Sequence, residues 1–189
     1  MIISHKHKFV FVKTRKTAGS TLEQILRPCL GEDDILTGST RDGTPPLNCK
    51  PDQDGHRVPK IPEGYMSFSI ERNPWDKVVS SYYWHKKIKS MAFGDWDFER
   101  YVLHSGMLPT DWHSYQVCDT VYKYEEMEAM YMSLMYHYNL DFNLELIYTT
   151  RLKSDIREIA DYRELHTPKT KDWVAHLFAR EIERFGYEF

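Results

Sequence analysis

Two short segments of this 189-residue chain constrain its fold more than any other feature. In each, an apolar run rich in β-forming residues leads directly into a turn that carries cations and opens a helix. The first run covers residues 9–12 and leads into 13–21, and the second covers 66–71 and leads into 72–82. Buried strands that alternate with helices form a parallel sheet covered by helices. The sequence therefore predicts an α/β fold.

The rest of the chain fits one domain, residues 1–189, which is long enough to bury a substantial core. The predicted strands cover residues 8–13, 66–71, 120–124 and 144–149. The predicted helices cover residues 19–30, a segment that begins at Pro74, and residues 96–104, 125–138 and 171–185. The inward side chains predicted for the last helix are Trp173, Val174, Leu177, Phe178, Ile182 and Phe185.

Residues 31–64 are rich in glycine and proline and follow no strand or helix pattern. A loop of this length inside a compact domain is usually a lid or a binding loop, or else it is disordered. We therefore expect residues 31–64 to form a lid or substrate loop. Specificity for the acceptor substrate is expected to lie in residues 33–64 and 91–117.

Composition narrows the kinds of partner. The formal net charge is −3, which gives no indication of a nucleic-acid partner. Basic residues nevertheless gather between His5 and Arg27, as expected for a pocket that binds a small anion. Cysteines 29, 49 and 118 form no C-x-x-C pair, so we expect no structural zinc. The chain lacks an apolar leader and an apolar stretch of about 18 residues, which predicts a cytoplasmic protein with no membrane partner.

The first turn has the features of a phosphate cradle. A strand, a turn of small residues and a helix start aim several backbone N–H groups and the helix dipole at one point. Residues 18–21 (Ala-Gly-Ser-Thr) keep the turn small, the hydroxyls of Ser20 and Thr21 add donors, and Lys16 adds a charge. The lysine precedes Gly19 by three residues, whereas a Walker A motif places Gly-Lys-Ser/Thr at the end of its loop. We therefore expect a phosphate site that needs no metal.

The second turn predicts a phosphate site built from side chains. Arg72 directly follows a strand, where its guanidinium can bind a phosphate through two hydrogen bonds. Ser80 lies about two helical turns further on, off the face formed by Val78, Val79 and Tyr82. The two side chains can converge on one anion. Two such turns on one sheet suit a nucleotide with phosphate groups at both its 3′ and 5′ ends.

Together the two segments resemble the cofactor motifs of sulfotransferases that use PAPS (3′-phosphoadenosine 5′-phosphosulfate). Residues 15–21 (RKTAGST) resemble the 5′-phosphosulfate loop P-K-T-G-[GS]-T-S, and residues 72–82 resemble the 3′-phosphate motif R-N-P-x-x-R-x-x-S-x-Y. Residues 161–163 and 179–187 are similar to the ending of Golgi-type carbohydrate sulfotransferases, including 2-O-sulfotransferases, and their bacterial relatives. The resemblance implies the sulfotransferase fold, a P-loop-like parallel β-sheet flanked by helices.

The resemblance also implies roles for individual residues. The residues expected to bind the cofactor are Arg15, Lys16, Thr17, Ala18, Gly19, Ser20, Thr21, Arg72 and Ser80. Lys16 would be catalytic because it neutralises charge on the leaving group, without a metal. The chain departs from the family at Arg15 and Lys77, which stand for proline and arginine. It also lacks the tryptophan on which cytosolic members stack adenine, so Tyr162, Arg163 and residues 151–153 are the candidates for that contact.

An acceptor hydroxyl must lose its proton to a base. His56 is the first candidate, because it lies in the loop between the two motifs and the 2-O-sulfotransferases place a catalytic histidine in a similar Gly-His setting. Glu23, just beyond the first turn, and His85 are the alternatives. His5 and His7 form an H-x-H pair that lacks nearby acidic or thiol partners, so we expect a charged strand margin there.

The predicted activity is a PAPS-dependent transfer of a sulfuryl group to a hydroxyl of a carbohydrate or small molecule. Two alternatives remain open from the sequence. One is a protein that binds 3′-phosphoadenosine nucleotides without turnover. The other is a nucleotide kinase that depends on magnesium, for which the first turn places its lysine wrongly.

Overall fold

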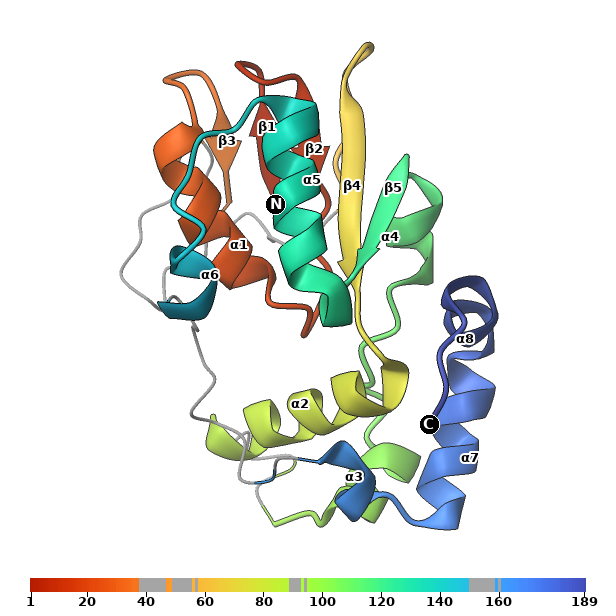
Figure 1. The fold of residues 1–189 in the computed structure, drawn as a ribbon. Helices are drawn as coiled ribbons and strands as arrows, with labels where there is room; N and C mark the ends of the chain where they lie inside the picture. Colours follow the sequence, from red (N-terminus) through yellow and green to blue (C-terminus); the bar gives the residue numbers. More distant parts are fainter. Residues whose placement is uncertain are drawn as a thin grey trace. The chain divides into compact units, whose positions relative to one another are not determined.

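The computed structural model describes residues 1–37, 47–48, 56, 58–88, 93, 95–149, 159 and 161–189. Its strands and helices confirm the predicted α/β class (Figure 1). The chain divides into two compact units, Met1–Glu71 with His113–Leu152, and Arg72–Trp112 with Lys153–Phe189.

The first unit contains a five-stranded sheet with the order β3-β1-β2-β4-β5. The strands are β1 (Ile2–Ser4), β2 (Phe9–Phe11), β3 (Ile35–Leu36), β4 (Met66–Glu71) and β5 (Thr120–Lys123). β4 is parallel to both β2 and β5, as predicted. β1 is antiparallel to both β2 and β3, so the prediction of a wholly parallel sheet was wrong at this edge. Both missed strands are too short to produce a readable pattern.

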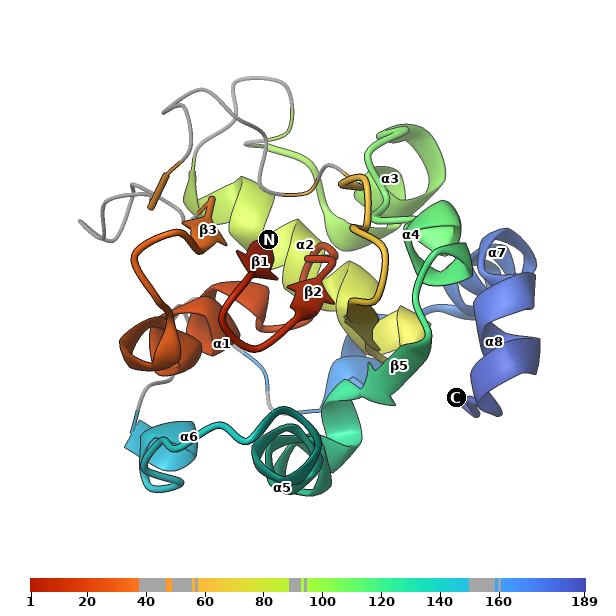
Figure 2. The ribbon, with the colours of Figure 1, turned by 90° about the horizontal axis from the view of Figure 1, so that it is seen from above.

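Helices α1 (Gly19–Leu26), α5 (Met127–Tyr138) and α6 (Leu146–Thr149) lie on one face of this sheet (Figure 2). Alternate residues of the strands, such as Phe9 and Phe11 on β2, point toward them because side chains alternate across a strand. The buried core of this unit consists of Ile2, Phe9, Phe11, Leu22, Ile25, Leu26, Cys29, Leu36, Phe68, Ile70, Met130, Tyr131, Leu134, Tyr138, Leu140 and Phe142. The ends of β2 and β4 therefore rest on a packed layer.

The segment 144–149, predicted as a strand, is instead a turn followed by the short helix α6 (Leu146–Thr149). The Asn143 side chain accepts a hydrogen bond from the backbone N–H of Glu145 at 2.9 Å. Its carbonyl oxygen accepts another from Leu146 at 3.1 Å. Local bonds of this kind offer the backbone a turn in place of a sheet partner. The apolar residues after Asn143 predicted a strand because such a pattern does not show these local hydrogen bonds.

The second unit contains α2 (Pro74–Lys87), α3 (Phe98–His104), α7 (Pro168–Leu177) and α8 (Ala179–Phe185). α4 (Trp112–Gln116) begins at its boundary and leads to β5. The buried core of the second unit consists of Trp75, Val78, Val79, Tyr82, Tyr83, Phe98, Tyr101, Val102, Leu108, Val174, Phe178 and Tyr187. The face predicted for the helix that begins at Pro74 is therefore confirmed.

The single helix predicted over residues 171–185 is two helices. Phe178 (φ −105°, ψ 24°) separates α7 from α8, so one helical repeat does not run through both. Val174 and Phe178 are buried as predicted, but Trp173 is 43% exposed and Leu177 is 40% exposed, so those two assignments were wrong. Among the described residues, no helix is both long and apolar enough to cross a membrane.

Asp34 fastens the turn after β1 to the segment before β3. Its carboxylate accepts hydrogen bonds from the backbone N–H groups of His5 (2.6 Å), Lys6 (3.1 Å) and Gly31 (2.9 Å) and from the Ser4 hydroxyl (2.7 Å). Burial alone raises the pKa of Asp34, but the donors outweigh it and leave the pKa below its ordinary value. The ionised carboxylate therefore stabilises this edge of the sheet.

We expect Asp34→Asn to lower the free energy of unfolding by about 2 to 3 kcal/mol near neutral pH, because the new amide sets donors against donors. Since the folded-state pKa is the lower one, the contribution is complete above the unfolded pKa and is lost as the pH falls through the folded pKa. Urea unfolding of wild type and variant between about pH 7 and pH 3 measures this. The difference in unfolding free energy between wild type and Asp34→Asn should vanish at the acidic end of this range. Asp33→Asn, at an exposed neighbouring position, is the control and should change the unfolding free energy little. A gap that stays constant with pH would contradict this explanation.

Candidate functional site

The turn between β2 and α1 has an unusual backbone. Lys16 (φ 65°) and Ala18 (φ 59°) both adopt left-handed conformations, which cost energy for residues that carry a Cβ. Left-handed residues within a turn direct successive N–H groups toward one point and form an anion-binding concavity. Two such residues, two positions apart, therefore make this turn a candidate anion-binding site.

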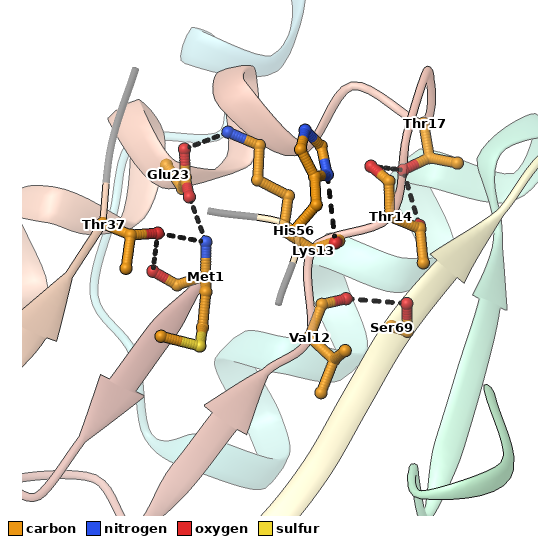
Figure 3. Close-up of polar contacts among 9 residues, drawn as sticks. All are labelled: Met1, Val12, Lys13, Thr14, Thr17, Glu23, Thr37, His56 and Ser69. Carbon is orange, nitrogen blue, oxygen red and sulfur yellow. Dashed lines mark hydrogen bonds and ion pairs between the residues drawn. The ribbon is translucent and has the colours of Figure 1, made fainter. Parts of the chain in front are cut away.

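Buried hydroxyl groups fasten this turn to the neighbouring strand β4 (Figure 3). The Thr14 hydroxyl donates to the carbonyl oxygen of Ile70 at 2.6 Å, and Thr17 donates to the carbonyl oxygen of Thr14 at 3.2 Å. Val12 is the residue directly before the turn, and its carbonyl oxygen accepts a hydrogen bond from the Ser69 hydroxyl at 2.7 Å. The Thr17 side chain is thus turned inward, and only its backbone N–H remains a candidate to face an anion.

The remaining residues predicted to bind the cofactor lie in the turn and in the first turn of α1. Arg15, Lys16 and Ser20 are half-buried and Thr21 is buried. The N–H of Thr21 bonds to the carbonyl oxygen of Ala18 at 2.9 Å, which closes the helix start. The first N–H groups of a helix have no partner within it, and the dipole makes this end favourable for a negative charge. The start of α1 and the left-handed turn before it are thus adjacent, and both are of the kind that favours a bound anion.

Lys13 and Glu23 form a buried ion pair beside this turn. Lys13 Nζ lies 2.6 Å from Glu23 Oε2, and the side chains are 8% and 4% exposed. The other carboxylate oxygen, Oε1, accepts from the ammonium group of Met1, which also bonds to the Thr37 hydroxyl at 2.9 Å (Figure 3). Glu23, the alternative candidate for the base, therefore has both oxygens engaged by cations.

His56, the first candidate for the base, lies next to the same turn. Its Nδ1 is 3.2 Å from the carbonyl oxygen of Lys13, and the residue is exposed. A carbonyl oxygen can only accept, so Nδ1 must carry the proton of this hydrogen bond. In neutral His56 the basic lone pair is then on Nε2, which is the tautomer that a general base at Nε2 requires.

The second turn begins at Arg72 in the second unit. Arg72 is 9% exposed, and its guanidinium donates to Asp76 Oδ2 from Nε at 2.7 Å, with Nη2 2.6 Å away. Asn73 caps α2 by accepting hydrogen bonds from the N–H groups of Trp75 (3.1 Å) and Asp76 (3.5 Å). The guanidinium is therefore held against the first turn of α2.

Two other residues of the second motif differ in their surroundings. Ser80 is half-buried on α2, two turns beyond Arg72. Lys77 is fully buried and its Nζ lies 3.1 Å from Asp111 Oδ2. In the same unit, burial raises the pKa of Glu181, and the positive charge of Lys77 partly offsets this increase. Lys77 therefore holds the interior of its own unit together.

The candidates for an adenine contact and the third candidate base also belong to the second unit. The Asn73 side chain donates to the Tyr162 hydroxyl at 3.3 Å, and the Arg163 guanidinium lies 4.5 Å from the centre of the Tyr162 ring. Tyr162 thus lies beside the Arg72 turn, while residues 151–153 lie outside the described residues. His85 Nδ1 contacts the carbonyl oxygen of Ser81 and the Tyr101 hydroxyl, each at 3.0 Å.

The H-x-H pair takes part in local hydrogen bonds. His5 Nδ1 contacts the Tyr65 hydroxyl at 2.8 Å, and the two ring nitrogens of His7 contact the carbonyl oxygens of Tyr138 (3.1 Å) and Cys29 (3.0 Å). In the part of the chain that the structure describes, no three His, Cys, Asp or Glu side chains are grouped for a metal ion.

Sequence reasoning missed the Lys13–Glu23 pair and the role of Gly19. A Cβ built on Gly19 would lie 2.7 Å from Lys13 Cγ, which is too close for a normal contact. Glycine is therefore needed there because a lysine side chain crosses the start of α1. The only sequence signal was a cation and a carboxylate on either side of a glycine, and it does not indicate a contact by itself.

Comparison with known proteins supports the fold. No family model matches the chain, and no curated protein matches its sequence. Among solved structures, the chain is similar to mouse sulfotransferase SULT7A1 complexed with PAP, with a TM-score of 0.53 and 14% sequence identity. The match covers 95% of this chain and 85% of that one. The chain therefore has the fold of a sulfotransferase, a sheet flanked by helices.

Proposed function

We propose that this protein is a PAPS-dependent sulfotransferase that transfers a sulfuryl group to a hydroxyl of a carbohydrate or small molecule. The observation that carries the proposal is the left-handed backbone at Lys16 and Ala18, placed at the start of α1. It occurs in a chain whose fold resembles a sulfotransferase solved with PAP. The likeness to Golgi-type carbohydrate enzymes rests on the sequence motifs, and it guides the choice of acceptors.

The proposal assigns one group of residues to each phosphate group of the nucleotide, without a metal. The backbone N–H groups of residues 17–21, with Lys16, Ser20 and Arg15, would hold the 5′-phosphosulfate. Arg72 and Ser80 would hold the 3′-phosphate, and Asp76 orients the Arg72 guanidinium. When bound, PAPS supplies the sulfuryl group and a PAP leaving group.

Lys16 and His56 would then divide the catalytic work. The Lys16 ammonium supplies positive charge where the leaving phosphate gains negative charge, and the loop is already shaped, so little reorganisation is needed. His56 would accept the proton of the acceptor hydroxyl at Nε2 while its Nδ1–H stays on the Lys13 carbonyl. The ion pairs of Glu23 argue against Glu23 in that role.

Calorimetric titration tests the proposal and its two alternatives. We expect PAP to bind in the absence of magnesium, and ATP to bind more weakly with or without magnesium. Transfer of radiolabel from PAPS to a panel of sugars and small alcohols then tests turnover. Tight binding of ATP that requires magnesium would support a kinase, and binding of PAP with no transfer to any acceptor would support a protein that only binds the nucleotide.

We expect His56→Ala to lower the transfer rate by about 10²- to 10⁴-fold while the affinity for PAP changes little, because a general base contributes about this much. Added imidazole should restore part of the rate. His113→Ala, which removes an exposed histidine at α4, is the matched control and should leave the rate unchanged. Full turnover in the His56 variant would remove the residue from the mechanism.

A further inference from the structure

Lys13 connects three parts of the candidate site. Its side chain crosses Gly19 at the start of α1. Its ammonium group pairs with Glu23, and its carbonyl oxygen contacts His56 (Figure 3). We propose that Lys13 and Glu23 form a positioning pair that shapes the phosphate-binding turn and holds the carbonyl that orients His56. This inference rests on the proposed function and assigns Glu23 a role other than that of a base.

The steric part of the argument concerns Gly19. A Cβ at this position would lie 2.7 Å from Lys13 Cγ, 3.2 Å from Cε and 3.3 Å from Cδ. The aliphatic stem of Lys13 therefore lies directly on the first residue of α1. Because Ala18, one residue earlier, has a left-handed backbone, a shift of this stem would disturb the strained part of the turn.

The electrostatic part concerns the burial of both partners. Lys13 is 6% exposed and Glu23 is 3% exposed, and their charged atoms are 2.6 Å apart. A buried ion pair adds little net stability relative to apolar side chains, but the loss of one partner leaves an uncompensated charge. The pair is therefore better understood as a directional constraint between the start of the turn and the middle of α1.

The third part concerns the carbonyl of Lys13. The preceding residue, Val12, is fixed by hydrogen bonds to Phe68 (2.8 Å) and Ser69 (2.7 Å) of β4. With Val12 held by the sheet and the Lys13 side chain held by Glu23, the Lys13 carbonyl has a defined direction. The Nδ1–H of His56 donates to this carbonyl oxygen, with Nδ1 3.2 Å away, and the hydrogen bond keeps the basic lone pair on Nε2.

Four variants separate positioning from stability. Lys13→Met keeps the aliphatic stem against Gly19 and removes the charge, Glu23→Gln removes the opposite charge, and Lys13→Arg keeps a cation. The double variant Lys13→Met/Glu23→Met replaces the pair with unbranched apolar side chains, but it also leaves the buried Met1 ammonium without its carboxylate. Lys169→Ala, which removes an exposed lysine of the second unit, is the control for loss of one positive charge.

The measurements are PAP affinity by calorimetry, kcat and KM for an acceptor, urea unfolding, and hydrogen exchange of residues 13–23 in the ligand-free protein. We expect Lys13→Met and the double variant to weaken PAP binding by about 10- to 100-fold and to lower kcat, since small misplacements have such effects. Hydrogen exchange of residues 13–23 should accelerate while that of β4 is unchanged. Lys13→Arg should retain most of the affinity. The double variant should lose some stability, because the buried Met1 ammonium is left without the Glu23 carboxylate, and its affinity for PAP should stay as low as that of Lys13→Met.

Three results would overturn the inference. The first is wild-type affinity for PAP and wild-type hydrogen exchange in the double variant. The second is a Glu23→Gln variant with normal PAP affinity but a greatly reduced kcat, which would make Glu23 the base. The third is a rate of hydrogen exchange at residues 13–23 that depends, in every variant, only on the free energy of global unfolding. If the wild-type protein fails to bind PAP, the proposed function fails, and the exchange measurement still decides whether Lys13 and Glu23 shape the turn.

Discussion

Lys16→Met is expected to lower kcat for sulfuryl transfer by at least about 100-fold, because one preorganised charged donor at a leaving group contributes about 10²- to 10³-fold. Methionine has a similar length but no charge. Both residues carry a Cβ, so the cost of the left-handed backbone at position 16 is nearly constant and the effect reports on the charge. Single-turnover rates with saturating PAPS provide the measurement.

The controls for this prediction separate charge from structure. Lys16→Arg should retain part of the rate because it keeps a cation, and Lys169→Ala at an exposed site should retain all of it. Urea unfolding should show that Lys16→Met folds as stably as the wild type. If Lys16→Met turns over at the wild-type rate, the account of how the leaving group is stabilised is wrong.

Arg72→Ala is expected to weaken PAP binding by about 30- to 5000-fold, since truncation of a buried, charge-assisted contact costs about 2 to 5 kcal/mol. The lost contact to the 3′-phosphate is one cause. The other is Asp76, whose carboxylate loses a guanidinium 2.6 Å away and then repels the same anion. Calorimetry with PAP measures the combined effect, and the affinity for 5′-AMP should fall much less.

A second substitution separates these two causes. Arg72→Ala/Asp76→Asn removes both charges, so it should recover the repulsive part of the loss but remain weaker than the wild type. Arg72→Lys keeps the charge but loses the two-pronged geometry and should be intermediate. Arg100→Ala, at an exposed position of α3, is the control. An affinity in the double variant equal to that of the wild type would show that Arg72 serves only to neutralise Asp76.

Long, strongly patterned elements were predictable from the sequence. The bounds of β4 agree with those expected, because six residues of β-forming character precede the cap and proline that begin α2. β1 and β3 were missed because three and two residues carry no period. The helix α6 was mistaken for a strand because the side chain of Asn143 provides a local partner that an apolar pattern does not reveal.

The candidate site was predictable in its residues more than in its contacts. The turn at Lys16 and the arginine after β4 follow from motifs, and the spacing of four residues between Arg72 and Asp76, across the start of α2, hinted at their pair. The Lys13–Glu23 pair could not, since it depends on the absence of a side chain at Gly19 and on burial created by the fold. Such contacts depend on packing and leave little trace in local sequence.

The central proposal is that the Lys16 turn binds the 5′-phosphate group of an adenosine nucleotide and that Arg72 binds a 3′-phosphate group. Calorimetry with PAP, 5′-AMP and 3′-AMP against wild type, Lys16→Met and Arg72→Ala tests it in a single set of titrations without magnesium. We predict that Lys16→Met weakens PAP and 5′-AMP but scarcely affects 3′-AMP, and that Arg72→Ala weakens PAP and 3′-AMP but scarcely affects 5′-AMP. Equal losses for all three nucleotides in both variants, or no loss in either, would contradict the claim.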